Sequence, residues 1–468
     1  MFKFKAPEAP AQGLCAVNIN AEKLSESGIP LNVKDGRVLI SPPEHHCMIY
    51  GVSGKGKTRR ILYPTVTMSA RAGHSMIIAD CKGEIYRHTA SELKKCGVDT
   101  KVINLRTPMY GNRYNPFALV ERAYKAGNKP RAAMLLRDLA EIITGGFKAD
   151  KDAYWQLAAC DAFVGFAQLL LEKGYHLDFG SIHAIVEDYI ASEYKHVIKR
   201  VINKDCKESK RRLSTVTSLV ADTTLGCVIS ELEAALTTYT TQEDVCDLLS
   251  ESEIDITDLV TRPTAVFLIC PDESVALYPI ASVFIAQAYA EMLRIADTRE
   301  DGKLPIKIDY ILDEFGNFTG SDWAAKLTAA RSRGIRFILA LQTLSQLVDR
   351  YGASDASTLT SNCRTLVYMG GRDIELMHQI DTFNGEASGI MGLATLQPGN
   401  IVVLGDSGIP TRGYLPDWSE WNVTEKARLM STKRQLKKRD YPTLLDVLGL
   451  SVGKDGFYEN DTDEEIPF

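Results

Sequence analysis

Short apolar runs alternate with longer helical patterns along most of the chain. The runs at Cys47–Tyr50, "IRFILAL" and "NIVVLGD" are bounded by glycine or polar residues, which is typical of buried strands. Between them, apolar residues recur at every third or fourth position, which indicates helices with one buried face. Because strands alternate with helices, we predict an α/β fold with a mostly parallel sheet.

The pattern changes between residues 151 and 247. Stretches such as "YWQLAACDAFVGFAQLLLEKG" and "FGSIHAIVEDYIASEY" keep the helical spacing, and strand signals are few. We therefore predict an all-α domain inserted into the α/β fold. It contains a basic run of seven basic and two acidic residues, the basic ones being Lys199, Arg200, Lys204, Lys207, Lys210, Arg211 and Arg212. Such a run is usually a solvated helix face, and contact with a nucleic-acid backbone is the sharper alternative.

Length and charge narrow the class of protein. At 468 residues the chain is long enough for two or three domains. The net charge is −6, and five acidic residues in the last ten positions leave the rest of the chain at −1. A nearly neutral body argues against a surface coated with basic residues for duplex DNA, although a local basic channel is compatible with it.

Cysteine and histidine usage indicates neither disulfides nor a metal centre. The ten cysteines form no C-x-x-C pair, and several lie in apolar runs, which favours buried free thiols in a reducing compartment. The eight histidines have no metal-ligand spacing, and His45-His46 is predicted to be a surface pair. The N-terminus lacks the apolar region of a signal peptide, and we see no run of about 18 apolar residues. We expect a cytoplasmic chain.

The stretch "GVSGKGKT" matches the P-loop pattern G-x-x-x-x-G-K-[ST]. Its glycines allow backbone N–H groups to surround phosphate oxygens, and the following helix adds the positive end of its dipole. We expect Lys57 to neutralise the β- and γ-phosphates of ATP and Thr58 to hold Mg²⁺. The predicted nucleotide-binding residues are Gly51, Ser53, Gly54, Lys55, Gly56, Lys57 and Thr58.

A second apolar strand ends in two carboxylates, in "IKIDYILDEFGNF". We expect Asp313 to bind the Mg²⁺ shell and Glu314 to polarise the attacking water. Acidic pairs at strand ends are common, but an upstream P-loop makes this pair specific. Hydrolysis of ATP is the predicted reaction, because a simple nucleotide-binding switch does not need Glu314.

Two further candidates flank the strand "IRFILAL". Gln342 follows its last residue and is placed to contact the γ-phosphate. Arg331 and Arg333 precede the strand. They are either surface charges or a source of an arginine finger that reaches the nucleotide of a neighbouring subunit.

The order of these motifs resembles the type IV secretion coupling proteins, the TraG/TraD-like ATPases of conjugative DNA transfer. The resemblance rests on the P-loop, "ADCKGE", "YNPF", the helical insert, "DEFGNF", "RSRG…ALQTLSQL" and "NCRTLVYMGGRD", over roughly residues 40–415. It implies a RecA-like motor, usually hexameric, that receives a relaxase–DNA complex and passes it to a secretion channel. By this resemblance Lys57 and Thr58 match the Walker A pair, Asp313 and Glu314 the Walker B pair, Gln342 the sensor, and Arg331 the trans-acting arginine.

Two features depart from that family. Most members carry two N-terminal membrane helices, which are not seen here, so docking at the inner face of the membrane would need a partner protein. The family's "DPKGE" is "DCKGE" in this chain, at Asp80 to Glu84. The charged residues of the motif are retained, and function is expected to be retained with them.

The predicted organisation has five parts. They are a small β-rich segment (1–45), a RecA-like domain (46–150 and 248–425), the inserted all-α domain (151–247), a helical extension (426–458) and an acidic disordered tail (459–468). The expected function is ATP-driven transfer of a relaxase–DNA substrate through a type IV secretion system. The expected partners are a homo-hexamer, DNA (single-stranded, with double-stranded as an alternative), relaxosome proteins and secretion-channel components. A related DNA-pumping motor, and an ATPase that gates protein substrates only, stay open as alternatives.

The tail "ENDTDEEIPF" combines acids with an apolar tip and resembles the C-terminal tip of bacterial single-stranded-DNA-binding proteins. We predict that the tail is a peptide that docks on a partner protein. The alternative is a solvated acidic tail without a function. The predicted docking residues are Asp461, Asp463, Glu464, Glu465, Ile466, Pro467 and Phe468.

Overall fold

The computed structural model divides into two compact units. It describes residues 14–18, 21–34, 36–145, 153–193, 195–218, 222–271, 273–320, 322–383, 389–406, 408–421, 427, 433–452, 457–459 and 465–466. The first, here called the sheet unit, comprises Met1–Arg106, Asp255–Val275 and Ala288–Thr432. The second, the helical unit, comprises Thr107–Ile254, Ala276–Gln287 and Lys433–Phe468.

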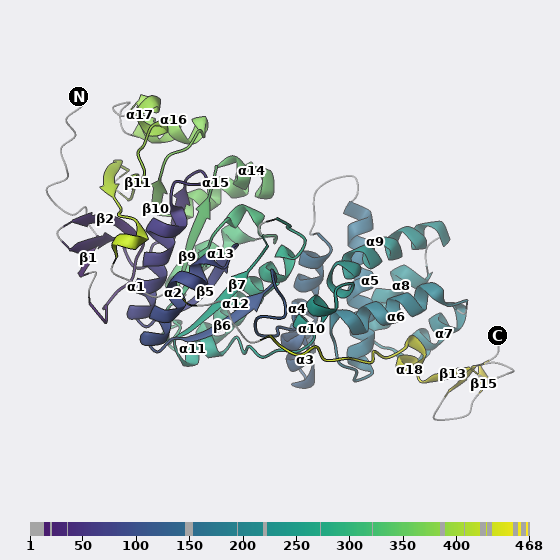
Figure 1. The fold of residues 1–468 in the computed structure, drawn as a ribbon. Helices are drawn as coiled ribbons and strands as arrows, with labels where there is room; N and C mark the ends of the chain where they lie inside the picture. The colour runs from purple at the N-terminus through teal and green to yellow at the C-terminus, as the bar shows by residue number, and fades with distance from the viewer. Residues whose placement is uncertain are drawn as a thin grey trace. The chain divides into compact units, whose positions relative to one another are not determined.

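A nine-stranded sheet forms the centre of the sheet unit, in the order β12-β11-β10-β4-β9-β8-β5-β7-β6 (Figure 1). All neighbours from β10 to β6 are parallel, whereas β11 and β12 are antiparallel additions at one edge. The strands are β4 (Cys47–Tyr50), β5 (Ser75–Asp80), β6 (Asp99–Asn104), β7 (Thr264–Ile269), β8 (Ile308–Leu312), β9 (Ile335–Leu341), β10 (Thr365–Tyr368), β11 (Asn400–Leu404) and β12 (Thr411–Tyr414). Every residue of β4, β5, β7, β8 and β9 is buried, which explains their unbroken apolar runs.

Helices and a second, small sheet complete this unit. The small sheet has the order β1-β3-β2 and is antiparallel, with β1 (Cys15–Asn18), β2 (Pro30–Lys34) and β3 (Arg37–Ile40), all within the segment predicted to be β-rich. The helices are η1 (Lys57–Leu62), α1 (Tyr63–Arg71), α2 (Glu84–Lys95), α11 (Asp258–Thr261), η2 (Phe315–Asn317), α13 (Trp323–Ala330), η3 (Arg331–Arg333), α14 (Ser345–Tyr351), α15 (Ala353–Asn362), α16 (Ile374–Phe383), α17 (Gly389–Ala394) and η4 (Trp418–Glu420). Helix α12 (Tyr278–Asp297) contributes residues to both units.

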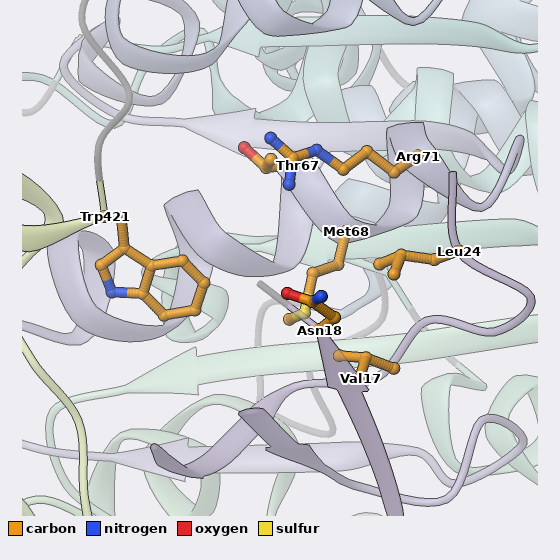
Figure 2. A pocket seen from close by; sticks show the side chains of 7 residues that line it. All are labelled: Val17, Asn18, Leu24, Thr67, Met68, Arg71 and Trp421. Atoms are coloured by element: carbon orange, nitrogen blue, oxygen red, sulfur yellow. The ribbon is translucent and has the colours of Figure 1, made fainter. Parts of the chain in front are cut away.

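A small cavity lies between α1 and the N-terminal sheet (Figure 2). Its volume of about 10 Å³ is close to that of one water-sized probe. Thr67 Oγ1 and Trp421 Nε1 line it, and both are buried without a hydrogen-bond partner among the described residues. Because Thr67 lies in the middle of α1, which follows η1, the cavity is separate from the phosphate-binding loop, which precedes η1.

The helical unit is larger than the predicted insert of residues 151–247. Its helices are α3 (Ala118–Lys125), α4 (Lys129–Ile143), α5 (Ala153–Glu172), α6 (Phe179–Ala191), α7 (Lys195–Asp205), α8 (Ser209–Ser218), α9 (Asp222–Thr240), α10 (Glu243–Leu248) and α18 (Leu444–Leu448). The unit begins at Thr107 because α3 packs on α4 and α4 packs on α5. The domain boundary predicted at residue 151 therefore separates α4 from α5, although these two helices pack together.

Helix α5 is the central helix of this unit and contacts α4, α6, α8 and α9 (Figure 1). By length and composition, its stretch Tyr154–Glu172 could span a membrane, contrary to the sequence expectation that no such run exists. About 72% of that stretch is buried inside the protein, which accounts for its apolar composition. Gly165 allows the close approach of α8, since a Cβ there would lie 2.7 Å from Leu213 Cδ2.

The C-terminal segment belongs to the helical unit but is mostly not helical, which corrects the predicted helical extension 426–458. Residues 433–443 have no regular structure and are held by ion pairs instead. Lys437 Nζ and Arg439 Nη2 lie 2.8 and 2.7 Å from the two carboxylate oxygens of Glu251. The nearly buried Asp247 pairs with Arg113 at 2.8 Å and accepts the backbone N–H of Lys437 at 3.2 Å.

Short strands follow α18. They are β13 (Leu450–Val452), β14 (Phe457–Glu459) and β15 (Glu465–Ile466), joined in an antiparallel sheet. The tail 459–468 was predicted to be disordered, and its described residues Glu459, Glu465 and Ile466 are instead paired in strands. Asp461, Asp463, Glu464, Pro467 and Phe468 lie outside the described residues.

Tyr441 fixes this segment on α6. Its ring lies directly over Gly180, where a Cβ would be 2.2 Å from Tyr441 Cζ, and its hydroxyl lies 3.1 Å from Cys246 Sγ. A glycine near the start of a helix is therefore required here by close packing, not by backbone conformation.

We predict that Gly180→Ala destabilises the protein by about 1–3 kcal/mol, because the added methyl group must displace the Tyr441 ring. Thermal and urea unfolding measure the change. Gly226→Ala is the matched control, since nothing lies within 4 Å of a Cβ at this helical position, and it is expected to be neutral or stabilising. Equal stability of the two variants would contradict the described contact.

Candidate nucleotide-binding site

The P-loop connects β4 to η1. Gly54 and Gly56 have φ values of 83° and 89°, in the left-handed region that favours glycine. Lys57 is buried, with 6% of its surface exposed, and its Nζ donates to Gly51 O at 2.6 Å. The Lys57 ammonium group is thus hydrogen-bonded to a carbonyl of the loop itself, at the position where phosphate oxygens would enter the loop.

The helix after the P-loop starts as a π-helix because of Pro64. Proline has no N–H to donate, and its ring would clash with the carbonyl four residues earlier, at Arg60. The backbone N–H of Tyr63 accordingly donates to Thr58 O, one residue further back than in an α-helix. Arg60 Nη1 then donates to Leu415 O at 2.6 Å, which holds the chain after β12 against this helix.

Thr58 and Asp313 meet at the carboxyl end of the sheet. Thr58 Oγ1 donates to Asp313 Oδ2 at 3.0 Å across 255 residues of sequence. Burial, and after it the neighbouring Glu314 carboxylate, raise the pKa of Asp313 to about 6, although Lys57 and Thr58 oppose the rise. A hydroxyl and a carboxylate oxygen in contact form a partial set of hard ligands that fits Mg²⁺.

This pair resembles an ordinary Mg²⁺ site of a nucleotide enzyme, in which phosphates and waters supply the remaining ligands. Within the described ranges, no group of three or more His, Cys, Asp and Glu residues could hold a metal ion by itself. The ligand set therefore suits a cation that arrives with a nucleotide.

Glu314 and Gln342 face each other beside the pair. Gln342 Nε2 lies 3.1 Å from both carboxylate oxygens of Glu314, and Lys57 Nζ lies 4.0 Å from Glu314 Oε1. Glu314 has φ 51°, in the left-handed region, which is uncommon for a residue other than glycine. The predicted water-activating residue is therefore in contact with the predicted γ-phosphate sensor.

Residues outside the predicted set support this sensor. Gln346 Oε1 accepts the backbone N–H of Gln342 at 3.0 Å. Asp373 accepts the N–H of Leu344 at 2.6 Å and that of Leu376 at 3.1 Å. Asp373 follows the loop whose Gly370 O accepts the P-loop N–H of Val52 at 3.3 Å. These contacts link the predicted sensor to the P-loop. Gln346 and Asp373 lie in stretches that carried the family resemblance, "ALQTLSQL" and "NCRTLVYMGGRD", but the sequence assigned neither of them a role.

The loop "DCKGE" has a structural role. Asp80 ends β5 and is buried, and its Oδ2 accepts the backbone N–H of Tyr86 at 2.8 Å at the start of α2. Burial raises the pKa of Asp80 to about 6, and the backbone N–H groups oppose the rise. Arg87 braces the same turn by donating to Gly83 O and Lys82 O. Cys81 replaces the family's proline and lies with Sγ 3.8 Å from Asp313 O.

Arg331 is not part of this cluster. It lies in η3, exposed, before the amino end of β9, whereas Gln342 follows the carboxyl end of that seven-residue strand. Seven residues of strand span about 23 Å. Arg331 is therefore far from the P-loop of its own chain. Arg333 is engaged locally, with Nη2 3.1 Å from Asp297 and Nη1 donating to Ala329 O.

His45 and His46 are buried, contrary to the predicted surface pair. His46 Nδ1 accepts the N–H of Phe337, and its Nε2 donates to Leu327 O at 2.8 Å, so the ring is neutral. Burial lowers the pKa of His46 to about 4. These two residues fix the amino end of the P-loop strand and are not ligands.

Comparison with solved structures confirms the RecA-like expectation for the fold. The bacterial conjugative coupling protein TrwBdeltaN70, in an unbound form, matches with a TM-score of 0.62 at 16% identity, covering 88% of this chain and 92% of that one. TrwB in complex with the non-hydrolysable ATP analogue ADPNP also gives 0.62 at 16% identity, over 92% and 98%. VirB4 of Thermoanaerobacter pseudethanolicus gives 0.50 at 12% identity, over 85% and 99%. At these identities the matches show the fold.

The sequence comparisons establish the family. No curated protein matches the chain. The family described as "Type IV secretory system Conjugative DNA transfer" matches residues 16–387, most of the chain. The motif order that resembled conjugative coupling proteins is thereby confirmed, and the chain belongs to the conjugative DNA transfer family of type IV secretory systems.

Proposed function

We propose that this protein is an ATPase that receives a relaxase–DNA substrate and drives its transfer through a type IV secretion system. The observation that carries the proposal is the cluster of Lys57, Thr58, Asp313, Glu314 and Gln342 at one edge of the parallel sheet. Family membership supports the conjugative role. The related TrwB structures with ADPNP, and with ADP and Mg²⁺, support ATP and Mg²⁺ as the ligands.

The contacts of the site suggest how its residues act during hydrolysis. Lys57 leaves Gly51 O and binds the β- and γ-phosphates, because a phosphate charge attracts the ammonium more strongly than a neutral carbonyl does. Mg²⁺ would be held by Thr58 and Asp313 and would neutralise charge that develops on the phosphates. Glu314 orients the attacking water and accepts its proton.

We infer that Gln342 couples the state of the bound nucleotide to the position of Glu314. In the described contacts its amide holds both oxygens of Glu314, so the carboxylate is occupied. A γ-phosphate is a competing acceptor for the same amide, and binding to it would release Glu314 toward water. The state of the nucleotide is then transmitted to α14 through Gln346 and to the P-loop neighbour Gly370 through Asp373.

The position of Arg331 supports the assembly of several copies of the chain into a ring. Because it lies at the opposite end of β9 from Gln342, it completes a site only on a neighbouring copy. A homo-hexamer places such an arginine at each subunit boundary and is the assembly we propose. Its position would be cytoplasmic, peripheral to the inner face of the membrane, and attached through secretion-channel partners.

The first prediction tests the function directly. Purified protein should hydrolyse ATP, and single-stranded DNA should raise the rate, because a translocating motor couples the two. Release of inorganic phosphate is measured with and without single- and double-stranded DNA, with Lys57→Ala as the inactive control. ATPase activity that ignores both forms of DNA would favour an ATPase that gates protein substrates. Stimulation without association with a relaxase would favour a general DNA pump.

A second prediction concerns Glu314→Gln. The amide keeps the size of the side chain but cannot accept the proton, so hydrolysis should fall by roughly 10²-fold or more while ATP still binds. Binding of a fluorescent ATP analogue separates the two effects. Glu375→Gln, at an exposed position of α16, is the control and should retain full activity. Unchanged hydrolysis in Glu314→Gln would remove the residue from the catalytic role.

A third prediction tests action across the subunit boundary. Arg331→Ala and Lys57→Ala should each be inactive alone, yet mixed oligomers should regain part of the activity. In such a mixture, some sites combine an intact Lys57 with an intact Arg331 from the neighbour. ATPase rates are measured across mixing ratios in oligomers verified by mass. If verified mixed oligomers stay inactive, Arg331 is a surface or structural residue, and Arg333 becomes the next candidate.

A further inference from the structure

The connection between β10 and β11 starts at the same edge of the sheet as the P-loop, because β10 runs parallel to β4. Residues 371–399 of this connection are here called the arm. It carries α16 and α17, which Figure 1 shows together beyond the ends of the strands and which pack on each other. Asp381 Oδ1 of α16 accepts the backbone N–H of Gly389 in α17 at 2.9 Å. The proposed mechanism gives this pair of helices no role.

Both ends of the arm are attached to the candidate nucleotide site. At its first end, Asp373 accepts the backbone N–H of Leu344, two residues after Gln342, at 2.6 Å. At its second end, Leu396 O accepts a hydrogen bond of 2.8 Å from Lys55 Nζ. Since Lys55 belongs to the P-loop, one end of the arm contacts the predicted sensor segment and the other contacts the P-loop.

Lys55 reaches Leu396 through a slot that Gly370 leaves open. Gly370 has φ 100°, in the left-handed region that favours glycine. A Cβ at this position would lie 3.2 Å from both Cε and Nζ of Lys55 and 3.4 Å from Leu396 Cβ. Gly370 O also accepts the N–H of Val52 in the P-loop at 3.3 Å. The end of the Lys55 side chain is therefore confined beside the backbone of Gly370, on the flank of the P-loop.

A second basic residue holds the same end of the arm. Arg60 Nη1, in η1, donates to Leu415 O at 2.6 Å, and Gly399 O accepts the N–H of Leu415 at 2.8 Å. A Cβ at Gly399 would lie 3.1 Å from Arg60 Nη1, so this guanidinium passes close to the last residue of the arm. The arm therefore ends between Lys55 and Arg60, which flank Lys57 in the sequence.

The two lysines of the P-loop have acceptors in different places. Lys57 Nζ donates to Gly51 O, which belongs to the loop itself. The acceptor of Lys55 is on the arm, 341 residues further along the chain. A phosphate could replace the acceptor of Lys57 without disturbing the arm. Lys55 could bind phosphate only by leaving the slot, and the buried Leu396 would then lose this donor, which costs free energy.

We propose that Lys55 is a positioning residue that links the arm to the P-loop, and that it does not bind phosphate. The inference rests on the proposed function, because it needs a nucleotide that rearranges the loop around Lys57. Only Gly56 separates Lys55 from Lys57, so a change in the loop moves the Lys55 ammonium and, with it, Leu396. A bound nucleotide then fixes the loop, and through Lys55 it fixes α16 and α17 as well.

Hydrogen exchange of the full-length chain, followed by mass spectrometry, tests this link. Lys55→Met keeps the unbranched stem of lysine but removes the donor, and Lys94→Met makes the same change at an exposed position of α2. In wild type and in Lys94→Met, saturating ADPNP with Mg²⁺ should slow amide exchange in α16 and α17 about fivefold, the effect of one hydrogen bond on a local opening equilibrium. In Lys55→Met this slowing should disappear, although calorimetry shows that ADPNP is bound.

Steady-state kinetics distinguish a positioning residue from a phosphate ligand. Lys55→Met should lower kcat for ATP about tenfold, because the loop that aligns Lys57 loses a support, and should leave KM within about threefold. A phosphate ligand would instead act on binding and raise KM. Thermal unfolding of each variant verifies that the fold is retained.

Two kinds of outcome would overturn the inference alone. If bound ADPNP leaves exchange in the arm of wild type unchanged, or slows it equally in Lys55→Met, the link through Lys55 does not operate. If KM rises about tenfold or more in Lys55→Met while kcat is unchanged, Lys55 binds phosphate. A wild-type protein that binds no ADPNP would overturn the proposed function and this inference together.

Discussion

The contact between Thr58 Oγ1 and Asp313 Oδ2 depends on the parallel register of β4, β9, β8 and β5. Tyr50 pairs with Leu341, and Leu312 pairs with both Leu339 and Ala79. The residues that follow these strands therefore leave the sheet at one edge, where the carboxyl ends of parallel strands meet. The phosphate binding, metal binding and γ-phosphate sensing that we propose all depend on that single alignment.

The opposite edge of the same strands is fixed by buried charges. Asp309 on β8 pairs with Arg336 on β9 at 2.8 Å, and both are buried with His74 and Ser69 as further partners. Burial alone would raise the pKa of Asp309, but Arg336 and His74 hold it well below its usual range. Removing one member would leave an uncompensated buried charge, which destabilises the fold more than replacing the whole pair with apolar residues does. The network therefore specifies which strands are neighbours.

The sequence predicted those parts of the site that are encoded by local pattern. The P-loop, the carboxylates Asp313 and Glu314, and the predicted sensor Gln342 each adjoin a short apolar strand, and the structure brings them together. Asp373 and Gln346 were missed because their role is to accept backbone N–H groups, which any polar residue in a turn could do. His45 and His46 were misassigned because two adjacent histidines carry no signal of burial.

The domain boundaries were harder to predict than the site. Helices α3 and α4 show the same periodicity as the helices that flank the sheet, and only the packing of α3 on α4 and of α4 on α5 assigns them to the helical unit. The segment 433–443 has no periodicity at all, since it is held by ion pairs and by the Tyr441 contact with Gly180. Irregular chain stabilised by long-range charges gives no local signal.

That segment makes the helical unit discontinuous in a way that matters for dissecting the protein. A fragment cut at residues 107 and 254 would appear complete by its helices, but it would lack the C-terminal chain that donates to Asp247 and pairs with Glu251. It would expose Gly180, which the Tyr441 ring covers, and it would remove the partners that Lys437 and Arg439 supply to Asp247 and Glu251. Properties measured on such a fragment would describe a different surface from that of the whole protein, so a faithful minimal version must carry residues 276–287 and 433–452 as further pieces.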